Sequence, residues 1–93
     1  MKKIFVLLTN CSERPVPNAA IEVALANYDW MRFNKDTHFF ISDHGPNYWD
    51  PIIKSVLDKD DTFTIIEVNV HNRHGWVPAV VRQWFERQAQ SAS

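Results

Sequence analysis

Hydrophobic and polar residues along the first third of the chain follow two different periods. Residues 4–8, Ile-Phe-Val-Leu-Leu, form an unbroken apolar run that is too short for a helix. Such a run is typical of a strand buried on both faces, so we expect a central strand there. After a loop that contains Pro15 and Pro17, apolar side chains recur at helical spacing and predict a helix from Asn18 to about Asp29.

Two segments rich in aromatic and β-branched residues come next, and a turn sequence separates them. The segments span residues 30–33 and 37–42, and residues 34–36, Asn-Lys-Asp, form a three-residue turn signal between them. This pattern predicts a β-hairpin. The break at residues 44–47, His-Gly-Pro-Asn, is followed by apolar positions that predict a short helix ending near Leu57.

The last third of the chain carries one more strand and one more helix. Apolar side chains alternate over residues 62–70, and Glu67 and Asn69 interrupt one of the two faces, which is typical of an edge strand. Apolar positions from Trp76 to about Gln88 have helical spacing and predict a closing helix.

The predicted elements follow the order β-α-β-β-α-β, with an additional C-terminal helix. This order is the split βαβ arrangement of ferredoxin-like folds, and it predicts an α+β domain of residues 1–93 in which residues 88–93 form a disordered tail. If residues 30–33 instead continue the first helix, the alternative is a small three-stranded parallel α/β sheet.

Size, charge and cysteine content restrict the classes of function. A chain of 93 residues is near the size at which a second copy adds buried surface that one core lacks, so we expect a homodimer. Its net charge of −1 excludes a strong non-specific attraction for polyanions. The single cysteine, Cys11, indicates a reducing cytoplasm, and no segment approaches the ~20 apolar residues of a membrane span.

Two polar clusters have the residue types of reactive or cation-binding sites but not the surrounding sequence. Only two residues separate Cys11 from Arg14, and prolines follow where a cysteine phosphatase has a glycine-rich cradle, so we expect an inert thiol. Asp58, Asp60 and Asp61 lack the glycine of a calcium loop and predict a solvated turn.

Histidines and an aspartate follow the third and fourth predicted strands. His44 lies next to Asp43, and His71 and His74 are two residues apart, all residue types that bind metals. In a split βαβ sheet we expect the ends of these two strands to lie at opposite edges, which leaves the histidines in water. In the parallel alternative, Cys11, Asp43 and His71 would gather at the carboxyl edge, as in a small α/β hydrolase or transferase.

Several segments of the chain resemble a family of small ferredoxin-fold proteins. They are residues 29–43 (DWMRFNKDTHFFISD), the helix end at 53–57, residues 58–68 (DKDDTFTIIEV) and residues 75–85 (GWVPAVVRQWF). The resemblance spans about residues 1–87 and is to proteins akin to the CRISPR adaptation endonuclease and to virulence-associated protein D, including short SinR-like relatives. It implies a homodimer with a sheet-based interface and a link to defence or toxin–antitoxin systems.

The nuclease members of that family have an aspartate at the end of the first strand. Paired across a dimer, such aspartates bind a metal that activates water. The matching stretch here is residues 7–11 (LLTNC), in which Thr9 and Asn10 stand in place of an aromatic residue and the aspartate. Because an amide is a weak metal ligand and cannot act as a general base, we expect the nuclease site to be degenerate at Asn10. We expect magnesium to bind only if cleavage activity survives, and we expect no other cofactor.

The resemblance also implies a module that binds RNA, DNA or a protein partner. We expect no membrane partner, because no segment has the length and apolar content of a span. Since the net charge is close to zero, nucleic-acid binding needs a local basic face. The candidates for that face are Lys2, Lys3, Arg32, Lys35, Arg73 and Arg82.

Overall fold

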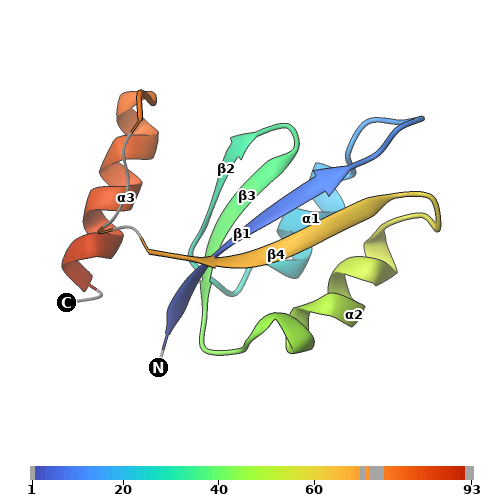
Figure 1. Ribbon diagram of the computed structural model, residues 1–93, viewed down its shortest axis with the longest axis horizontal. Coiled ribbons are helices and arrows are strands. Elements are labelled where there is room, and N and C mark those ends of the chain that lie inside the picture. The colour runs from blue at the N-terminus through green and yellow to red at the C-terminus, as the bar shows by residue number, and fades with distance from the viewer. Residues whose placement is uncertain (1, 70, 72–74, 92–93) are drawn as a thin grey trace.

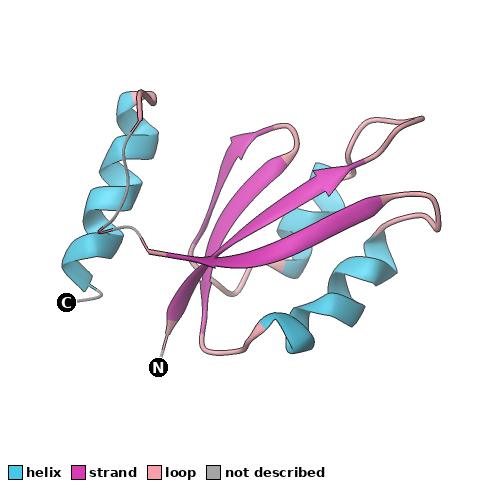
Figure 2. Cartoon of the chain, viewed as in Figure 1, coloured by secondary structure: helices cyan, strands magenta, loops and turns pink. Residues whose placement is uncertain are grey.

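The computed structural model describes residues 2–69, 71 and 75–91, which form one sheet and the helices that pack on it (Figures 1 and 2). The elements in chain order are β1 (Lys3–Asn10), α1 (Asn18–Ala24), β2 (Trp30–Asn34), β3 (Thr37–Ser42), α2 (Pro46–Val56), β4 (Thr62–Val68) and α3 (Ala79–Ser91).

The sheet has four strands in the order β2-β3-β1-β4, and every neighbouring pair is antiparallel. In this register Val6 of β1 lies between Phe39 of β3 and Ile66 of β4. The predictions of a central first strand and a last strand at the edge are confirmed. The alternative of a three-stranded parallel sheet is wrong, because β3 and β4 both run antiparallel to β1.

The connection between α1 and β2 decides between these two topologies. The predicted helix continued to Asp29, whereas α1 ends at Ala24 and the chain then turns, with the Tyr28 amide donating to the Leu25 carbonyl. The Ile41 amide donates to the Asp29 carbonyl at 2.9 Å, which places the start of β2 beside β3. The predicted hairpin is confirmed, and in its turn the Asp36 amide donates to the Asn34 side chain.

Helices α1 and α2 cover one face of the sheet, and α3 lies apart from them on the other side (Figure 1). The main core lies between the sheet and the first two helices and consists of Phe5, Leu7, Ile21, Leu25, Phe40, Trp49 and Ile53. A smaller cluster on the opposite face packs Trp84 of α3 against Ile4, with Phe39 and Phe85 beside them. Because α3 is a single helix, it covers only part of that face.

The final helix begins later and ends later than predicted. Pro78 disfavours helical geometry at Val77, so α3 starts at Ala79 rather than at Trp76. It continues to Ser91, so residues 88–91, which were expected in a disordered tail, are helical, and residues 92–93 lie outside the described residues. With 13 residues α3 is well below the ~20 that cross a membrane, and no helix in the described part of the chain has the length and apolar content to do so.

Candidate functional site

The end of β1 is the position at which the family resemblance places a catalytic aspartate. Asn10 is the exposed last residue of β1 and lies opposite Thr62 of β4. The preceding Thr9 is buried, and both its amide and its hydroxyl donate to the Asp36 carbonyl, at 2.9 and 3.0 Å. Within residues 2–69, 71 and 75–91, no three side chains of the His, Cys, Asp or Glu type come together as metal ligands.

Cys11 lies just beyond Asn10, in a setting that disfavours the thiolate. Burial raises the pKa of the Cys11 thiol, and its hydrogen bond to Asp61 raises it further. Arg14 donates to Asp61 at 2.6 Å and lies 3.0 Å from Asp58, so the loop after β1 is joined to the loop before β4. The cluster is therefore a structural connection between two loops.

In the turn at Asp58–Asp61, Asp58 and Asp60 are exposed as the sequence predicted, and Asp61 is the exception. The Asp61 side chain is only 6% exposed, and its carboxylate accepts the Asp58 backbone amide as well as Arg14. These two hydrogen bonds, the backbone one first, lower the pKa of Asp61.

Cys11, Asp43 and His71 are not brought together, so the hydrolase or transferase alternative has no assembled centre. Because β1 and β3 are antiparallel, with Lys3 opposite Ser42, Cys11 and Asp43 lie at opposite ends of the sheet. An eight-residue strand is roughly 26 Å long, which no side chain spans. His71 follows β4 and is exposed.

The expectation that the third and fourth strands end at opposite edges is wrong. Both strands are antiparallel to β1, so they are parallel to each other and end on the same side, with β1 between them. His44 stacks on Tyr48 with ring centroids 3.9 Å apart, and His74 lies outside the described residues.

Five of the six basic residues proposed for nucleic acid lie in the described part of the chain, and these five do not share one face. Lys2 and Lys35 lie at opposite ends of the sheet, because Lys35 is in the β2–β3 turn and Lys2 precedes β1. Three others are paired with carboxylates: Lys3 with Glu67 at 3.5 Å, Arg82 with Glu86 at 3.8 Å, and Arg32 with Glu22 at 2.6 Å. Arg73 lies outside the described residues.

A partly buried charge network, which the sequence analysis did not identify, joins α1 to the β2–β3 hairpin. Glu22 of α1 accepts two hydrogen bonds from the Arg32 guanidinium, at 2.6 and 2.8 Å. The same carboxylate lies 2.8 Å from Nε2 of His38, whose side chain is fully buried. The Nδ1 atom of His38 has no hydrogen-bond partner in the described part of the chain.

The pKa values of this network follow from its geometry. The pKa of Glu22 is lowered to about 2, chiefly by its hydrogen bonds from the Arg32 guanidinium. Partial burial acts to raise this pKa, and the hydrogen bond with His38 lowers it further. Burial lowers the pKa of His38, although Glu22 acts in the opposite direction. At neutral pH the arrangement is therefore an ion pair beside a neutral histidine. Arg32 and His38 face each other in the hairpin register, so a predicted hairpin with the turn at residues 34–36 could have paired them.

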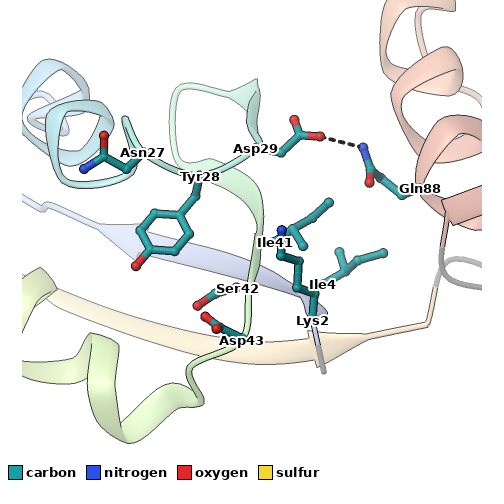
Figure 3. Close-up of a pocket in the computed structure, with 9 residues that line it drawn as sticks. All are labelled: Lys2, Ile4, Asn27, Tyr28, Asp29, Ile41, Ser42, Asp43 and Gln88. Atoms are coloured by element: carbon teal, nitrogen blue, oxygen red, sulfur yellow. Dashed lines mark hydrogen bonds between the residues drawn. The ribbon is translucent and has the colours of Figure 1, made fainter.

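A pocket of about 390 Å³ lies between the start of β1, the end of β3, the α1–β2 connection and α3 (Figure 3). Its lining residues are Lys2, Ile4, Asn27, Tyr28, Asp29, Ile41, Ser42, Asp43 and Gln88. The Asp29 carboxylate holds α3 in place, since it accepts Trp84 Nε1 at 3.1 Å and Gln88 Nε2 at 3.0 Å. The sequence analysis missed this pocket because α3 forms one of its walls through long-range contacts.

The outer edge of β4 and the nearby sheet face form the other exposed feature of interest. β4 pairs with β1 on one side, and no strand of the described residues pairs with its other side. On the face opposite α1 and α2, Leu8 is 40% and Ile66 is 48% exposed, while Trp76 and Val80 near the start of α3 are 100% and 69% exposed.

Comparison of the chain with models of known protein families, with curated proteins and with solved structures finds no match in any of the three. The family membership expected from the sequence motifs therefore stays a prediction.

Proposed function

We propose that the chain is a homodimeric binding protein with a ferredoxin-like fold, which assembles with a second copy of itself through the outer edge of β4. The strand order β2-β3-β1-β4, with α1 and α2 on one face, supports the ferredoxin-like assignment. The resemblance to adaptation-type endonucleases is part of the proposal, and the nuclease function is lost at Asn10.

The unprotected edge of β4 is the observation that carries this proposal. Monomeric proteins usually protect edge strands with proline, lysine, a bulge or a covering element. β4, with the sequence TFTIIEV, has no proline or lysine and pairs with β1 in unbroken register. The other edge strand, β2, has a register irregularity between Arg32 and Asn34, the kind of feature that protects an edge.

A second copy fits this edge by symmetry. Two identical strands related by a two-fold axis pair antiparallel, which continues the antiparallel pattern of the sheet. With the axis at Ile65, the middle of β4, each Glu67 lies opposite a Phe63 and not opposite another Glu67. The contact therefore brings no like charges together across the axis.

The apolar side chains beside the edge favour the same contact. Ile66 points to the sheet face opposite α1 and α2, and Leu8 is its near neighbour because Val6 and Leu8 lie opposite Ile66 and Thr64. In the extended sheet the two copies of Ile66 lie on the same face near the axis. Their contact would bury apolar surface that each monomer exposes to water.

Binding to RNA or DNA is not part of the proposal, because the charges of the described residues do not favour it. A phosphate-binding face needs several cations that are not already engaged by carboxylates. Arg32 is held by Glu22 in two hydrogen bonds, and Lys2 and Lys35 lie at opposite ends of the sheet rather than side by side.

The proposal is tested by sedimentation of the wild type and of two lysine variants at micromolar concentration. The wild type should have twice the mass of the 10.9 kDa chain. Ile66→Lys places two cations near the axis and should weaken the dimer on the order of tenfold or more. Val80→Lys changes a residue that is also exposed but lies on α3, and should leave the mass unchanged. A monomeric wild type, or an Ile66→Lys variant that dimerises like the wild type, would contradict the proposal.

A further inference from the structure

Two hollows follow the outer edge of β4 on the face of the sheet that carries α2, which lies beside β4 (Figure 1). Their volumes are about 310 and 320 Å³, and each is lined by residues of α2 and by Phe63 of β4. Neither is lined by a described residue of β1, so both open on the side of β4 that faces away from β1. A second copy that pairs with β4 would therefore place side chains beside these hollows.

The two hollows carry different charges. The hollow beside the middle of β4 is lined by Asp50 together with Ile65. The hollow beside the start of β4 is lined by Lys54 and Lys59. Phe63 lies between them, because it lines both.

Most charges around the second hollow are already engaged within the chain. Asp58 and Asp61 also line it, but Arg14 holds both carboxylates, at 3.0 and 2.6 Å. Lys54 pairs with Asp50 at 2.9 Å. Lys59 is exposed and forms no ion pair within the described part of the chain. It is therefore the cation that remains for a partner.

Glu67 of a second copy has the charge and the position to reach this cation. Phe63 and Glu67 point to the same face of the sheet, because side chains of a strand alternate. In the proposed dimer, with its axis at Ile65, Glu67 of one copy lies opposite Phe63 of the other. The Cβ atoms of such a cross-strand pair are roughly 4.5–5.5 Å apart, so the Glu67 carboxylate comes within reach of the Lys59 ammonium in the hollow beside Phe63.

Glu67 is available for this contact. Its side chain is 55% exposed, and its ion pair with Lys3 of the same copy, at 3.5 Å, joins two half-exposed groups. A carboxylate has two oxygens that can accept several hydrogen bonds, so Glu67 can keep Lys3 and also bind Lys59 of the other copy.

The neighbouring registers of the two strands would not give this contact. Sliding the strands by two residues keeps every side chain on its face but moves the axis to Thr64 or to Ile66. With the axis at Thr64, Glu67 lies opposite Asp61. With the axis at Ile66, Glu67 lies opposite Ile65, which lines the hollow of Asp50. Both alternatives bring Glu67 toward another carboxylate, which disfavours them.

We propose that Glu67 of each copy binds Lys59 of the other and that these two symmetric contacts set the register of the dimer. The inference rests on the proposed function, because it assumes that the copies pair through β4. Backbone hydrogen bonds alone would accept any strand at this edge, and the two ion pairs make the edge selective for a second copy of the same chain.

The test reverses each charge and measures dimerisation of the full chain by sedimentation. Lys59→Glu and Glu67→Lys should each weaken the dimer about five- to thirtyfold at low salt, because each replaces two attractive contacts by two repulsive ones. Both residues are exposed, so both variants should fold. The loss should become smaller at high salt, which screens exposed charges. Lys35→Glu makes the same charge change in the exposed β2–β3 turn and should leave the dimer unchanged.

Mixing the variants gives the sharper result. In a heterodimer of Glu67→Lys with Lys59→Glu, both contacts again join opposite charges, so dimers should reappear with nearly wild-type affinity. Glu67→Lys mixed with Lys35→Glu has the same net charges but keeps one Lys–Lys contact, so its heterodimer should stay weaker. Native mass spectrometry of the two mixtures measures the heterodimer in each.

The contrary results separate this inference from the proposed function. If Lys59→Glu and Glu67→Lys dimerise like the wild type, or if Glu67→Lys pairs equally well with both partners, the ion pairs do not set the register. The β4 dimer itself would still stand if Ile66→Lys weakens it. A monomeric wild type would overturn the dimer and this inference with it.

Discussion

Replacing Glu22 by glutamine removes the charge that joins α1 to the β2–β3 hairpin while keeping the size of the side chain. In the wild type the carboxylate accepts two hydrogen bonds from Arg32 and lies 2.8 Å from Nε2 of His38. The variant keeps a neutral amide at this position, which cannot form the ion pair with Arg32. The amide has one oxygen that accepts hydrogen bonds, where the carboxylate has two. The fully buried His38 and Arg32 must then compete for that one acceptor.

The size of the effect follows from the pKa of Glu22, which falls from 4.5 to about 2 in the folded chain. Since each pKa unit corresponds to about 1.4 kcal/mol, the ionised carboxylate contributes up to about 3 kcal/mol to folding at pH 7. The glutamine amide still makes neutral hydrogen bonds that recover part of this. We therefore expect Glu22→Gln to lower the free energy of unfolding by about 2–3 kcal/mol at pH 7.

The effect should depend on pH in a direction set by the lowered pKa. A carboxylate with a depressed folded pKa contributes fully above its unfolded pKa of 4.5, and the contribution is lost as the pH falls toward about 2. At pH 3 the contribution of Glu22 should therefore be roughly half or less of its value at pH 7. Because burial also lowers the pKa of His38, the wild type should begin to lose stability as the pH falls below 6.5.

Urea unfolding followed by tryptophan fluorescence measures these free energies at pH 7 and at pH 3. Glu86→Gln is the matched control, since Glu86 pairs with Arg82 at 3.8 Å and both side chains are more than half exposed. Such a pair contributes less than about 1 kcal/mol. If Glu22→Gln and Glu86→Gln are equally stable at pH 7, the network around Glu22 does not act as we describe.

Three further variants and reagents test other parts of the structure. Asp29→Ala removes the acceptor of Trp84 and Gln88, so it should lower the free energy of unfolding by about 1–3 kcal/mol and speed amide exchange in α3 more than in β1. An equal increase in exchange in both elements would contradict this. Cys11 should react with an aromatic disulfide reagent more slowly than free cysteine does at pH 7. Asp61→Asn should speed the reaction, because it lowers the pKa of the thiol. A wild-type reaction faster than that of free cysteine would show an activated thiolate. Asn10→Ala should leave any cleavage of RNA unchanged, and a native activity that this substitution abolishes would restore the nuclease hypothesis.

The strands of this protein could be predicted because their signals are local. The apolar run at residues 4–8 predicted a central strand, and the turn at residues 34–36 predicted the hairpin that the structure contains. Helix boundaries were less predictable, because they depend on contacts that the pattern does not encode. α1 stops five residues before Asp29, where the chain must turn to bring β2 beside β3.

The candidate sites could not be predicted for a different reason. Asp29 and Gln88 are 59 positions apart, and their hydrogen bond depends on where α3 packs against the sheet. In the sequence Asp61 is one of several carboxylates that predict a solvated turn. In the structure the loops after β1 and before β4 lie together, and Arg14 donates to Asp61. In each case the chemistry of a side chain is set by a neighbour that only the tertiary structure supplies.

Amide hydrogen exchange of β4 at low and at high micromolar concentration tests the central proposal most directly. In an edge strand every second amide points away from the sheet and exchanges freely unless another strand pairs with it. If a second copy binds there, the outward amides of Thr62–Val68 should become protected as the concentration rises, while those of β2 stay unchanged. The contrary result is exchange in β4 that does not depend on concentration although the protein sediments with twice the 10.9 kDa mass of one chain. It would show that the dimer forms elsewhere and would contradict the proposed interface.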